Sequence, residues 1–419
     1  MRKVLMIAFH FPPVAMGSGH LRTLGFVRYL PALGWEPTVL SAGTAAFPRV
    51  DSGNIELVPD GCRVQRAFAL DVQRHLSIRG KYPGFLAQPD RWSSWWIAAV
   101  WKGLRLIRRH RMSAIWSTYP IMTAHCIAET LSRITGLPWI ADFRDPVASS
   151  VESGNPFSVS SQKRCERRVL ARATRVVFTT PGAMHRYAEH YPQTFSENRM
   201  AVVSNGYDET VFSDIPGTTN GTHSPLRLVH SGILYSDGRD PLPFFSALAN
   251  LRDAGVVTMA DVRVVLRASG SEAKYGVEIR RRGLEGMVTL APPVSNREAL
   301  LEQADADALL LFQGSKFDQQ IPAKAYEYLR IGRPILALVG RGGDTEALLR
   351  STGGATLVEL DDVAAIERGL MEFIRAIRGG RAPVANRDVV QQYSRRQGAA
   401  VLADLLDQSV RLKSARRML

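Results

Sequence analysis

A carboxylate and an ammonium group lie three residues apart in a short stretch near the end of the chain, residues 319–334, which read QQIPAKAYEYLRIGRP. Pro322 and Gly332 supply start and stop signals for a helix of about two to three turns. Lys324 and Glu327 would both lie on this helix. A carboxylate in that position could accept hydrogen bonds from two adjacent sugar hydroxyls.

The residues before this helix predict a buried strand and a loop. Residues 308–312 form a short apolar run that is typical of a parallel strand, and residues 314–321 then connect it to the helix N-terminus. Unpaired backbone N–H groups and the positive end of the helix dipole favour anions there. Open α/β sheets bind ligands at this edge.

This stretch resembles the donor-binding signature of retaining GT-B glycosyltransferases of family 4, a glutamate followed by seven residues and a second glutamate. The resemblance implies that Glu327 engages the nucleotide ribose and that the first position, here Gln319, engages the transferred sugar. Gln319 keeps hydrogen-bonding capacity without the charge, which implies altered sugar recognition or a divergent branch. The backbone of four following residues would also contact the sugar: Gln320, Ile321, Pro322 and Ala323. An exposed amphipathic helix with a Lys/Glu pair is the alternative.

A glycine-containing loop follows the first predicted strand. Gly17, Ser18 and Gly19 lead into a helix, so their backbone N–H groups could face a phosphate. Arg22 occupies the third glycine position of GxGxxG, which weakens a dinucleotide interpretation. The loop resembles the glycine loop of family 4 enzymes, which faces the donor diphosphate. A plain strand-to-helix turn is the alternative.

Charged residues also follow the predicted strand at 139–141. Asp142, Arg144 and Asp145 would lie at its carboxyl end, where charges are expected only if they face a polar site. Family 4 enzymes often have a histidine where Arg144 stands. We expect Arg144 to contact a phosphate and Asp145, or else Asp142, to orient an acceptor hydroxyl. An Arg/Asp pair that holds the loop is the alternative.

The loop that opens the second half of the chain carries one further cation. Ser231 and Gly232 follow a predicted strand, and family members commonly continue with an arginine and, five residues later, a lysine. Ile233 stands at the arginine position, and Arg239 lies one residue beyond the lysine position. The resemblance therefore assigns the diphosphate to Arg239, with Lys324 or Arg144 as second contributor.

Length and composition restrict the class of protein. A chain of 419 residues favours two domains of roughly 200 residues each. Cys62, Cys126 and Cys165 are widely spaced without CxxC pairing, which argues against a disulfide framework and a zinc site and favours the cytoplasm. The apolar start lacks a cleavage pattern, and no run reaches the about 18 apolar residues of a membrane span. The resemblance implies no metal and no cofactor besides the nucleotide sugar as co-substrate.

The formal charge of +14 favours phosphate-rich partners. Nucleic acid is the weaker inference, because the basic clusters lack interleaved aromatics and no zinc-finger or RNP pattern occurs. A basic and aromatic segment could form an interfacial helix on an anionic membrane, at its inner face, or a core helix with an exposed basic side. Its residues are Trp92, Trp95, Trp96, Trp101, Lys102, Arg105, Arg108 and Arg109.

Strand and helix patterns alternate along the chain, which predicts an α/β fold with mostly parallel sheets. The predicted strands are 4–9, 38–40, 114–116, 139–141, 175–178 and 200–203, then 226–230, 262–267, 288–290 and 308–312. The predicted helices are 21–33, 122–135 and 162–173, then 243–251, 273–282, 297–303, 323–331 and 398–410.

These patterns predict two Rossmann-like domains that face a cleft, the GT-B architecture. Residues 1–215 would form the acceptor-side domain, 216–225 a linker rich in Gly, Pro, Thr and Asn, and 226–385 the nucleotide-sugar domain. Residues 386–419 would be a helical segment. In the GT-B fold such a segment crosses back to the first domain, and a peripheral helix of the second domain is the alternative.

The resemblance therefore implies a hexosyl or related transferase that moves a sugar from a nucleotide diphosphate donor to a hydroxyl acceptor, with retention, in glycan or glycoconjugate biosynthesis. A lipid-linked acceptor and a cytoplasmic or membrane-peripheral location are consistent with it. A sugar-nucleotide epimerase of the same fold, a dinucleotide-dependent oxidoreductase and a non-catalytic scaffold are the rival classes.

Overall fold

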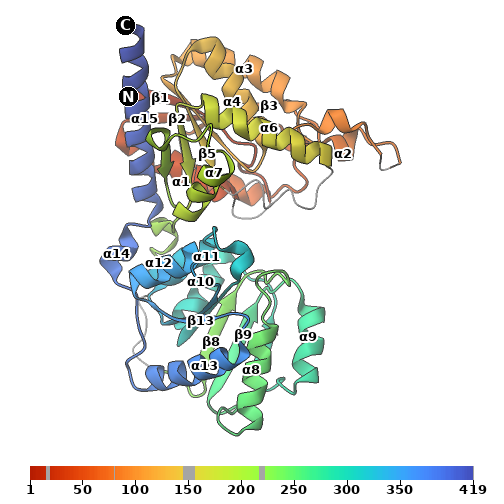
Figure 1. The fold of residues 1–419 in the computed structure, drawn as a ribbon, viewed down its shortest axis with the longest axis vertical. Coiled ribbons are helices and arrows are strands. Elements are labelled where there is room, and N and C mark those ends of the chain that lie inside the picture. Colours follow the sequence, from red (N-terminus) through yellow and green to blue (C-terminus); the bar gives the residue numbers. More distant parts are fainter. Residues whose placement is uncertain (16–18, 80, 145–155, 217–221, 419) are drawn as a thin grey trace. The chain divides into compact units, whose positions relative to one another are not determined.

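The computed structural model describes residues 1–15, 19–79, 81–144, 156–216 and 222–418 (Figure 1). The chain divides into two compact units. Unit 1 comprises Met1–Asn205 together with Arg395–Leu419, and unit 2 comprises Gly206–Ser394.

Unit 1 is built on a parallel sheet of seven strands in the order β3-β2-β1-β4-β5-β6-β7. Val4 and Met6 of β1 point to one face and Leu5 and Ile7 to the other, and all four are fully buried. Burial on both faces explains the continuous apolar run. The strands are β1 (Arg2–Ile7), β2 (Trp35–Ala42), β3 (Arg63–Ala67), β4 (Ala114–Thr118), β5 (Trp139–Phe143), β6 (Arg175–Phe178) and β7 (Met200–Val202).

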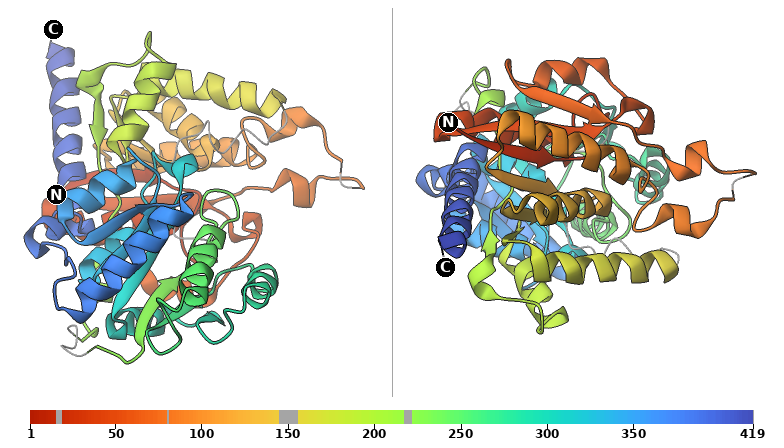
Figure 2. Two further views of the ribbon diagram at one scale, coloured as in Figure 1. Left: turned by 60° about the horizontal axis from the view of Figure 1, so that its bottom comes forward. Right: turned by 90° about the horizontal axis from the view of Figure 1, so that it is seen from above.

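Helices cover both faces of this sheet, as Figures 1 and 2 show. One face packs against α3 (Trp95–His110), α4 (Met122–Thr135), α6 (Pro156–Arg172) and α7 (Pro181–His190). The other packs against α1 (Gly19–Tyr29) and α15 (Arg395–Met418). A single-turn helix, α2 (Val72–His75), lies outside these layers.

The C-terminal helix belongs to the first unit. Its residues Ala399, Leu402 and Leu406 are buried in the same core as Val4 and Met6 of β1, and α15 also packs along α1. The crossing back that the resemblance implied is therefore observed, and the helix runs longer than the predicted 398–410.

Unit 2 has a second parallel sheet, in the order β10-β9-β8-β11-β12-β13. Its strands β8, β11 and β12 are also buried on both faces. The strands are β8 (Leu226–Ser231), β9 (Val262–Arg267), β10 (Val288–Ala291), β11 (Ala308–Gln313), β12 (Ile335–Val339) and β13 (Ala355–Glu359).

The helices of unit 2 form two layers around its sheet. One layer contains α8 (Leu242–Asp253), α9 (Glu272–Arg281) and α13 (Val363–Arg378). The other contains α10 (Asn296–Asp305), α11 (Ala323–Ile331), α12 (Asp344–Thr352) and α14 (Arg387–Gln391). Short 3₁₀ turns in the two units are Pro31–Leu33, Thr44–Ala46, Ser52–Leu57, Gly84–Ala87, Glu197–Arg199, Glu209–Val211 and Ser315–Phe317.

The predicted α/β class is confirmed, and several elements are additions to the prediction. β3, β12 and β13 and the helices α2, α7, α12, α13 and α14 are in the structure but not among the predicted ranges, whereas α3 covers the basic and aromatic segment for which a helix was expected. The predicted helix at 21–33 divides into α1 and a 3₁₀ turn, because Pro31 cannot donate the next helical hydrogen bond. In the part of the chain that the structure describes, no helix is long and apolar enough to cross a membrane.

Candidate functional site

The strand orders place a topological switch point in each unit. In unit 2 the order reverses between β8 and β11, and the loops after these two strands therefore diverge. Ligands of open α/β sheets bind at such points, beyond the carboxyl ends of the strands. The predicted residues Ser231, Gly232 and Arg239 follow β8, and Gln319 to Glu327 follow β11.

Lys324 lies against a buried histidine at this switch point. Its Nζ is 3.0 Å from Nε2 of His230, the last residue but one of β8. Nδ1 of His230 is 2.9 Å from the carbonyl oxygen of Leu310, which can only accept. Nε2 of His230 also lies 3.1 Å from the carbonyl oxygen of Gly232. Burial first and Lys324 second lower the pKa of His230 well below its usual range, which favours the neutral imidazole.

Arg239 is held by an amide and two aromatic rings. Its Nε donates to Oε1 of Gln313 at 2.7 Å. Its guanidinium carbon lies 4.8 Å from the ring centroid of Phe317 and 5.5 Å from that of Tyr235. This packing fixes the guanidinium without neutralising it.

The two cations lower each other's tendency to be charged. Among the residues described by the structure, neither Arg239 nor Lys324 forms an ion pair with a carboxylate. Burial, and after it the charge of Arg239, lowers the pKa of Lys324 to about 7, while Glu327 acts in the opposite direction. Burial also lowers the pKa of Arg239. Partly desolvated positive charge of this kind would be stabilised by an anion.

Gly232 makes room for the lysine. Its φ of +105° is in the region that favours glycine, and a Cβ built there would lie 3.1 Å from Nζ of Lys324. The backbone N–H of Ser231 donates to the hydroxyl of Tyr328 at 2.9 Å, so the strand end is fixed to α11. Ile233, at the family's arginine position, is 51% exposed and adds no charge.

The loop between β11 and α11 is braced by the fully buried Gln313. The amide nitrogen of Gln313 donates to the carbonyl oxygens of Phe317 and Gln320, and Thr345 donates to the latter as well. The N–H of Gln320 donates to the carbonyl of Phe317. Both polar backbone groups of Gln320 are therefore already hydrogen-bonded within the loop, and its expected sugar contact stays a prediction.

The remaining predicted residues of this stretch lie in the loop after β11 or on α11. Gln319 and Ile321 are half-buried, Pro322 is the N-cap of α11, and Ala323 is its first residue. Pro322 was expected one position later, inside the helix. Glu327 is half-buried on α11, and its charge acts on Lys324. The carboxylate is thus not enclosed in the apolar core.

In unit 1 the predicted loop is described only in part. Gly17, Ser18 and Asp145 lie outside the described residues. Gly19 begins α1, and its carbonyl accepts from the Arg144 guanidinium at 2.7 Å. A Cβ on Gly19 would lie 2.6 Å from that guanidinium. The structure therefore brings together two predicted residues, one at the start of α1 and one directly after β5.

Asp142 is not available to an acceptor. Its carboxylate forms a two-point ion pair with Arg22, at 2.8 and 3.0 Å, and accepts from the hydroxyl of Thr118 at 2.8 Å. Arg22 also donates to the carbonyl oxygen of Ser204 and the side chain of Asn205. The suggested acceptor role of Asp142 is wrong, because this fully buried pair ties α1 to β5 and to the end of β7.

A family model matches part of the chain. Residues 18–206, less than half of the chain, match the family model described as a glycosyl transferase 4-like domain. No curated protein matches the chain.

Solved structures show that the whole chain shares the GT-B fold. Sucrose-phosphate synthase from Thermosynechococcus elongatus has a TM-score of 0.67 and 13% identity, over 97% of this chain and 99% of that one. HepE from Anabaena, solved with UDP, has a TM-score of 0.59 and 14% identity over 99% of both chains. The galactosyltransferase WaaB has a TM-score of 0.60 and 12% identity, over 96% and 99%. The resemblance to GT-B glycosyltransferases is thereby confirmed.

Several residues around the predicted site were missed from the sequence. His230 and Gln313 are polar residues at the ends of apolar strands, a signal that could have found them. Tyr328 gave no such signal, because an aromatic residue on a helix is ordinarily core. In unit 1 His10 was also missed, and burial, then Arg144 and then His20, lowers its pKa to about 4.

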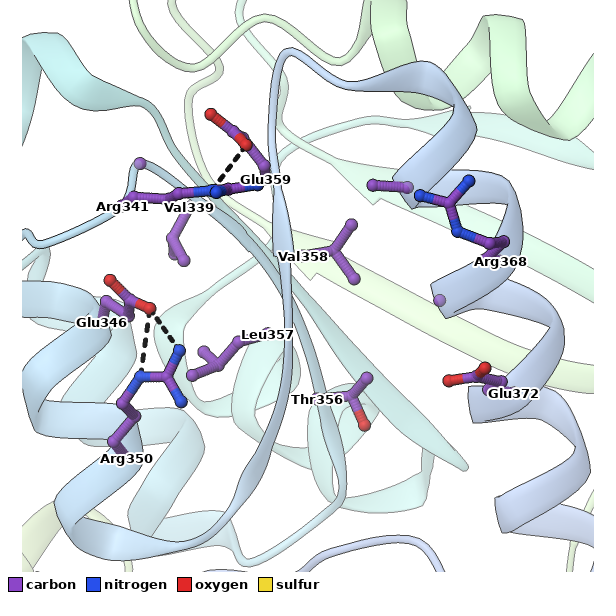
Figure 3. A pocket seen from close by; sticks show the side chains of 13 residues that line it. Val339, Arg341, Glu346, Arg350, Thr356, Leu357, Val358, Glu359, Arg368 and Glu372 are labelled. Carbon is purple, nitrogen blue, oxygen red and sulfur yellow. Dashed lines mark hydrogen bonds and ion pairs between the residues drawn. The ribbon is translucent and has the colours of Figure 1, made fainter.

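A separate cavity in unit 2 lies away from these residues. Its volume is about 460 Å³, and it lies between α12, β13 and α13 (Figure 3). Two ion pairs line this cavity, one between Arg341 and Glu359 at 2.7 Å and one between Arg350 and Glu346 at 2.6 Å. It shares no lining residue with the Arg239 and Lys324 cluster.

Proposed function

We propose that the protein transfers a sugar, hexosyl or related, from a nucleotide diphosphate donor to a hydroxyl acceptor, with retention, in glycan or glycoconjugate synthesis. The observation that carries the proposal is the pair of coupled cations, Arg239 and Lys324, at the β8/β11 switch point, without a carboxylate partner among the described residues. Arg239 and the protonated form of Lys324 would suit a diphosphate both as it binds and as it leaves.

The residues of the α11 region would bind the rest of the donor. We assign the ribose to Glu327, because it is half-buried on the same helix as Lys324 and its charge reaches the cation cluster. Gln319 and the N-terminal backbone of α11 at Ile321, Pro322 and Ala323 would contact the sugar. UDP-glucose is a sensible first donor to test, because HepE has been solved with it.

In unit 1 the Gly17–Gly19 loop is proposed to offer N–H groups to a phosphate, and Arg144 and Asp145 to take part in catalysis. The contact of Arg144 with the N-terminus of α1 supports an anion-binding role for its guanidinium. We further propose that transfer needs no cofactor, that the acceptor is lipid-linked, and that the protein is cytoplasmic and contacts an anionic membrane peripherally.

The test is a thermal-shift and calorimetric screen with UDP-, GDP- and TDP-sugars. Wild type should be stabilised by one donor class, and Glu327→Gln should raise its Kd about tenfold or more, because two hydrogen bonds to a charged acceptor are weakened. Glu372→Gln, at an exposed glutamate of α13, is the control and should bind normally. No stabilisation of wild type by any donor would refute the proposal.

Product analysis separates the rival functions. Free nucleotide and a glycosylated acceptor should form together, whereas an epimerase would convert the donor without an acceptor. A protein that binds donor without either reaction would be a scaffold. The replacement of the family's glutamate by Gln319 and of its arginine by Ile233 is compatible with that class.

A further inference from the structure

The segment from Val72 to Met112 in unit 1 has a strongly one-sided charge. It contains nine basic residues and one acidic residue, Asp90. The Asp90 carboxylate accepts from the backbone N–H and the hydroxyl of Thr123 at 2.7 and 2.9 Å, so it is occupied by the start of α4. The charged side chains that remain for the surface of this segment are therefore basic. The basic residues are Arg74, Arg79, Lys81, Arg91, Lys102, Arg105, Arg108, Arg109 and Arg111.

The helix α3 within this segment has a core side and an outer side. Trp95, Ala99 and Gly103 are buried, and a Cβ on Gly103 would lie 2.6 Å from a methyl group of Leu131, so this side packs tightly on α4. The side chains of Ile97 and Trp101 lie on the other side and are 71% and 58% exposed. Two of the four tryptophans that the sequence singled out therefore serve the core or its edge, Trp95 and Trp92.

The exposed side of α3 continues from apolar to cationic. Ile97, Trp101, Arg105 and Arg108 are spaced by four, four and three residues, so they form one stripe along the helix. The Arg105 guanidinium carbon lies 3.6 Å from the ring centroid of Trp101. An exposed tryptophan that lies beneath an arginine fits the boundary between lipid headgroups and acyl chains.

The loop after α2 has the same combination of side chains. Ile78 is 80% exposed and Phe85 is 72% exposed, and both are among the most exposed large apolar side chains of the described residues. Arg79 and Lys81 lie between them and are also exposed. Apolar side chains that water surrounds in the free protein gain from insertion into a bilayer interface.

We propose that α3 and the loop residues 76–79 and 81–85 form a surface that docks on anionic lipid bilayers. The occupant is assigned by charge complementarity, because a cationic surface without exposed acidic residues fits the negative headgroups and its apolar residues fit the interface. The inference specifies the membrane contact of the proposed function and rests on that part of it. Lipid binding itself needs neither donor nor transfer.

Vesicle co-sedimentation with the full chain tests the surface. Wild type should bind phosphatidylcholine vesicles that contain phosphatidylglycerol, should not bind pure phosphatidylcholine, and should lose binding at high salt. The variants Arg105→Glu with Arg108→Glu, Ile97→Ser with Trp101→Ser, and Ile78→Ser with Phe85→Ser should each weaken partitioning about tenfold or more.

The matched control comes from α9, which also exposes an apolar and a basic residue. Val277 is 53% exposed and Arg281 is exposed one turn later, and Val277→Ser with Arg281→Glu should bind vesicles as wild type does. A thermal-shift measurement with nucleotide sugar on each variant reports folding and donor binding separately from lipid binding.

The following outcomes would overturn the assignment. They are full binding by any of the three test variants, an equal loss in the α9 control, or wild-type binding to neutral vesicles alone. Loss of a dimer in the test variants, without vesicle binding by wild type, would instead mark the surface as an interface between copies. Vesicle binding with no donor binding would leave this inference standing and remove the transferase proposal.

Discussion

The protonation of Lys324 depends on its surroundings in unit 2. Its pKa is lowered from 10.5 to about 7, first by burial. Between about pH 7 and pH 10.5 the unfolded chain therefore binds one more proton at this site than the folded chain does. The free energy of unfolding should rise with pH across that window, and the full cost of burying the charge should be present below it.

Donor binding should have the opposite pH dependence. A diphosphate favours the ammonium form, so binding above about pH 7 should take up a proton and weaken by at most about tenfold per pH unit. Titration calorimetry in buffers of different ionisation enthalpy measures both the affinity and the number of protons taken up on binding. Lys324→Met should bind weakly and take up no proton, and a wild-type affinity that is flat across the window would contradict the prediction.

At the scale of elements, the buried pair Arg22 and Asp142 joins α1 to β5. Removal of one charge leaves the other buried and unpaired, which is costlier than loss of the pair itself. Asp142→Asn should therefore lower the free energy of unfolding of unit 1 by about 3–5 kcal/mol, as measured by urea denaturation. Arg2→Gln breaks a pair whose side chains are 48% and 41% exposed and should cost at most about 1 kcal/mol. Equal decreases in the free energy of unfolding for the two variants would show that the buried pair contributes no more to stability than the exposed pair.

At the scale of the whole molecule, the last helix completes the first unit's core. Leu406 is fully buried among residues from the start of the chain. Leu406→Ala should destabilise unit 1 by about 2–5 kcal/mol, because the cavity cannot fully collapse. Val401→Ala on the same helix, where the side chain is 39% exposed, should have little effect.

Scanning calorimetry with and without donor distinguishes the two units in that experiment. Because most of the proposed donor contacts lie in unit 2, a donor should raise the transition of that unit more than the transition of unit 1, by mass action. The transition that Leu406→Ala lowers should be the one that the donor raises less. A shift of the donor-sensitive transition instead would show that α15 does not stabilise unit 1 alone.

The sequence alone determined the fold class and the elements on which the candidate donor-site residues of unit 2 lie. Strands buried on both faces have continuous apolar runs, and helices end at glycine or proline, so local composition was enough for β9, α4 and the loop before α11. It also placed Lys324 and Glu327 on one helix. These features depend on residues close together in the chain.

Only the tertiary structure decided which distant groups meet. Lys324 and His230 are 94 positions apart, and Arg22 and Asp142 are 120 positions apart. Their contacts follow from which strands are neighbours in each sheet, and no local pattern encodes the order in which parallel strands assemble. For the same reason the sequence left open whether Asp142 faces a ligand or forms a buried ion pair. The residues next to Asp142 in the chain are compatible with either environment.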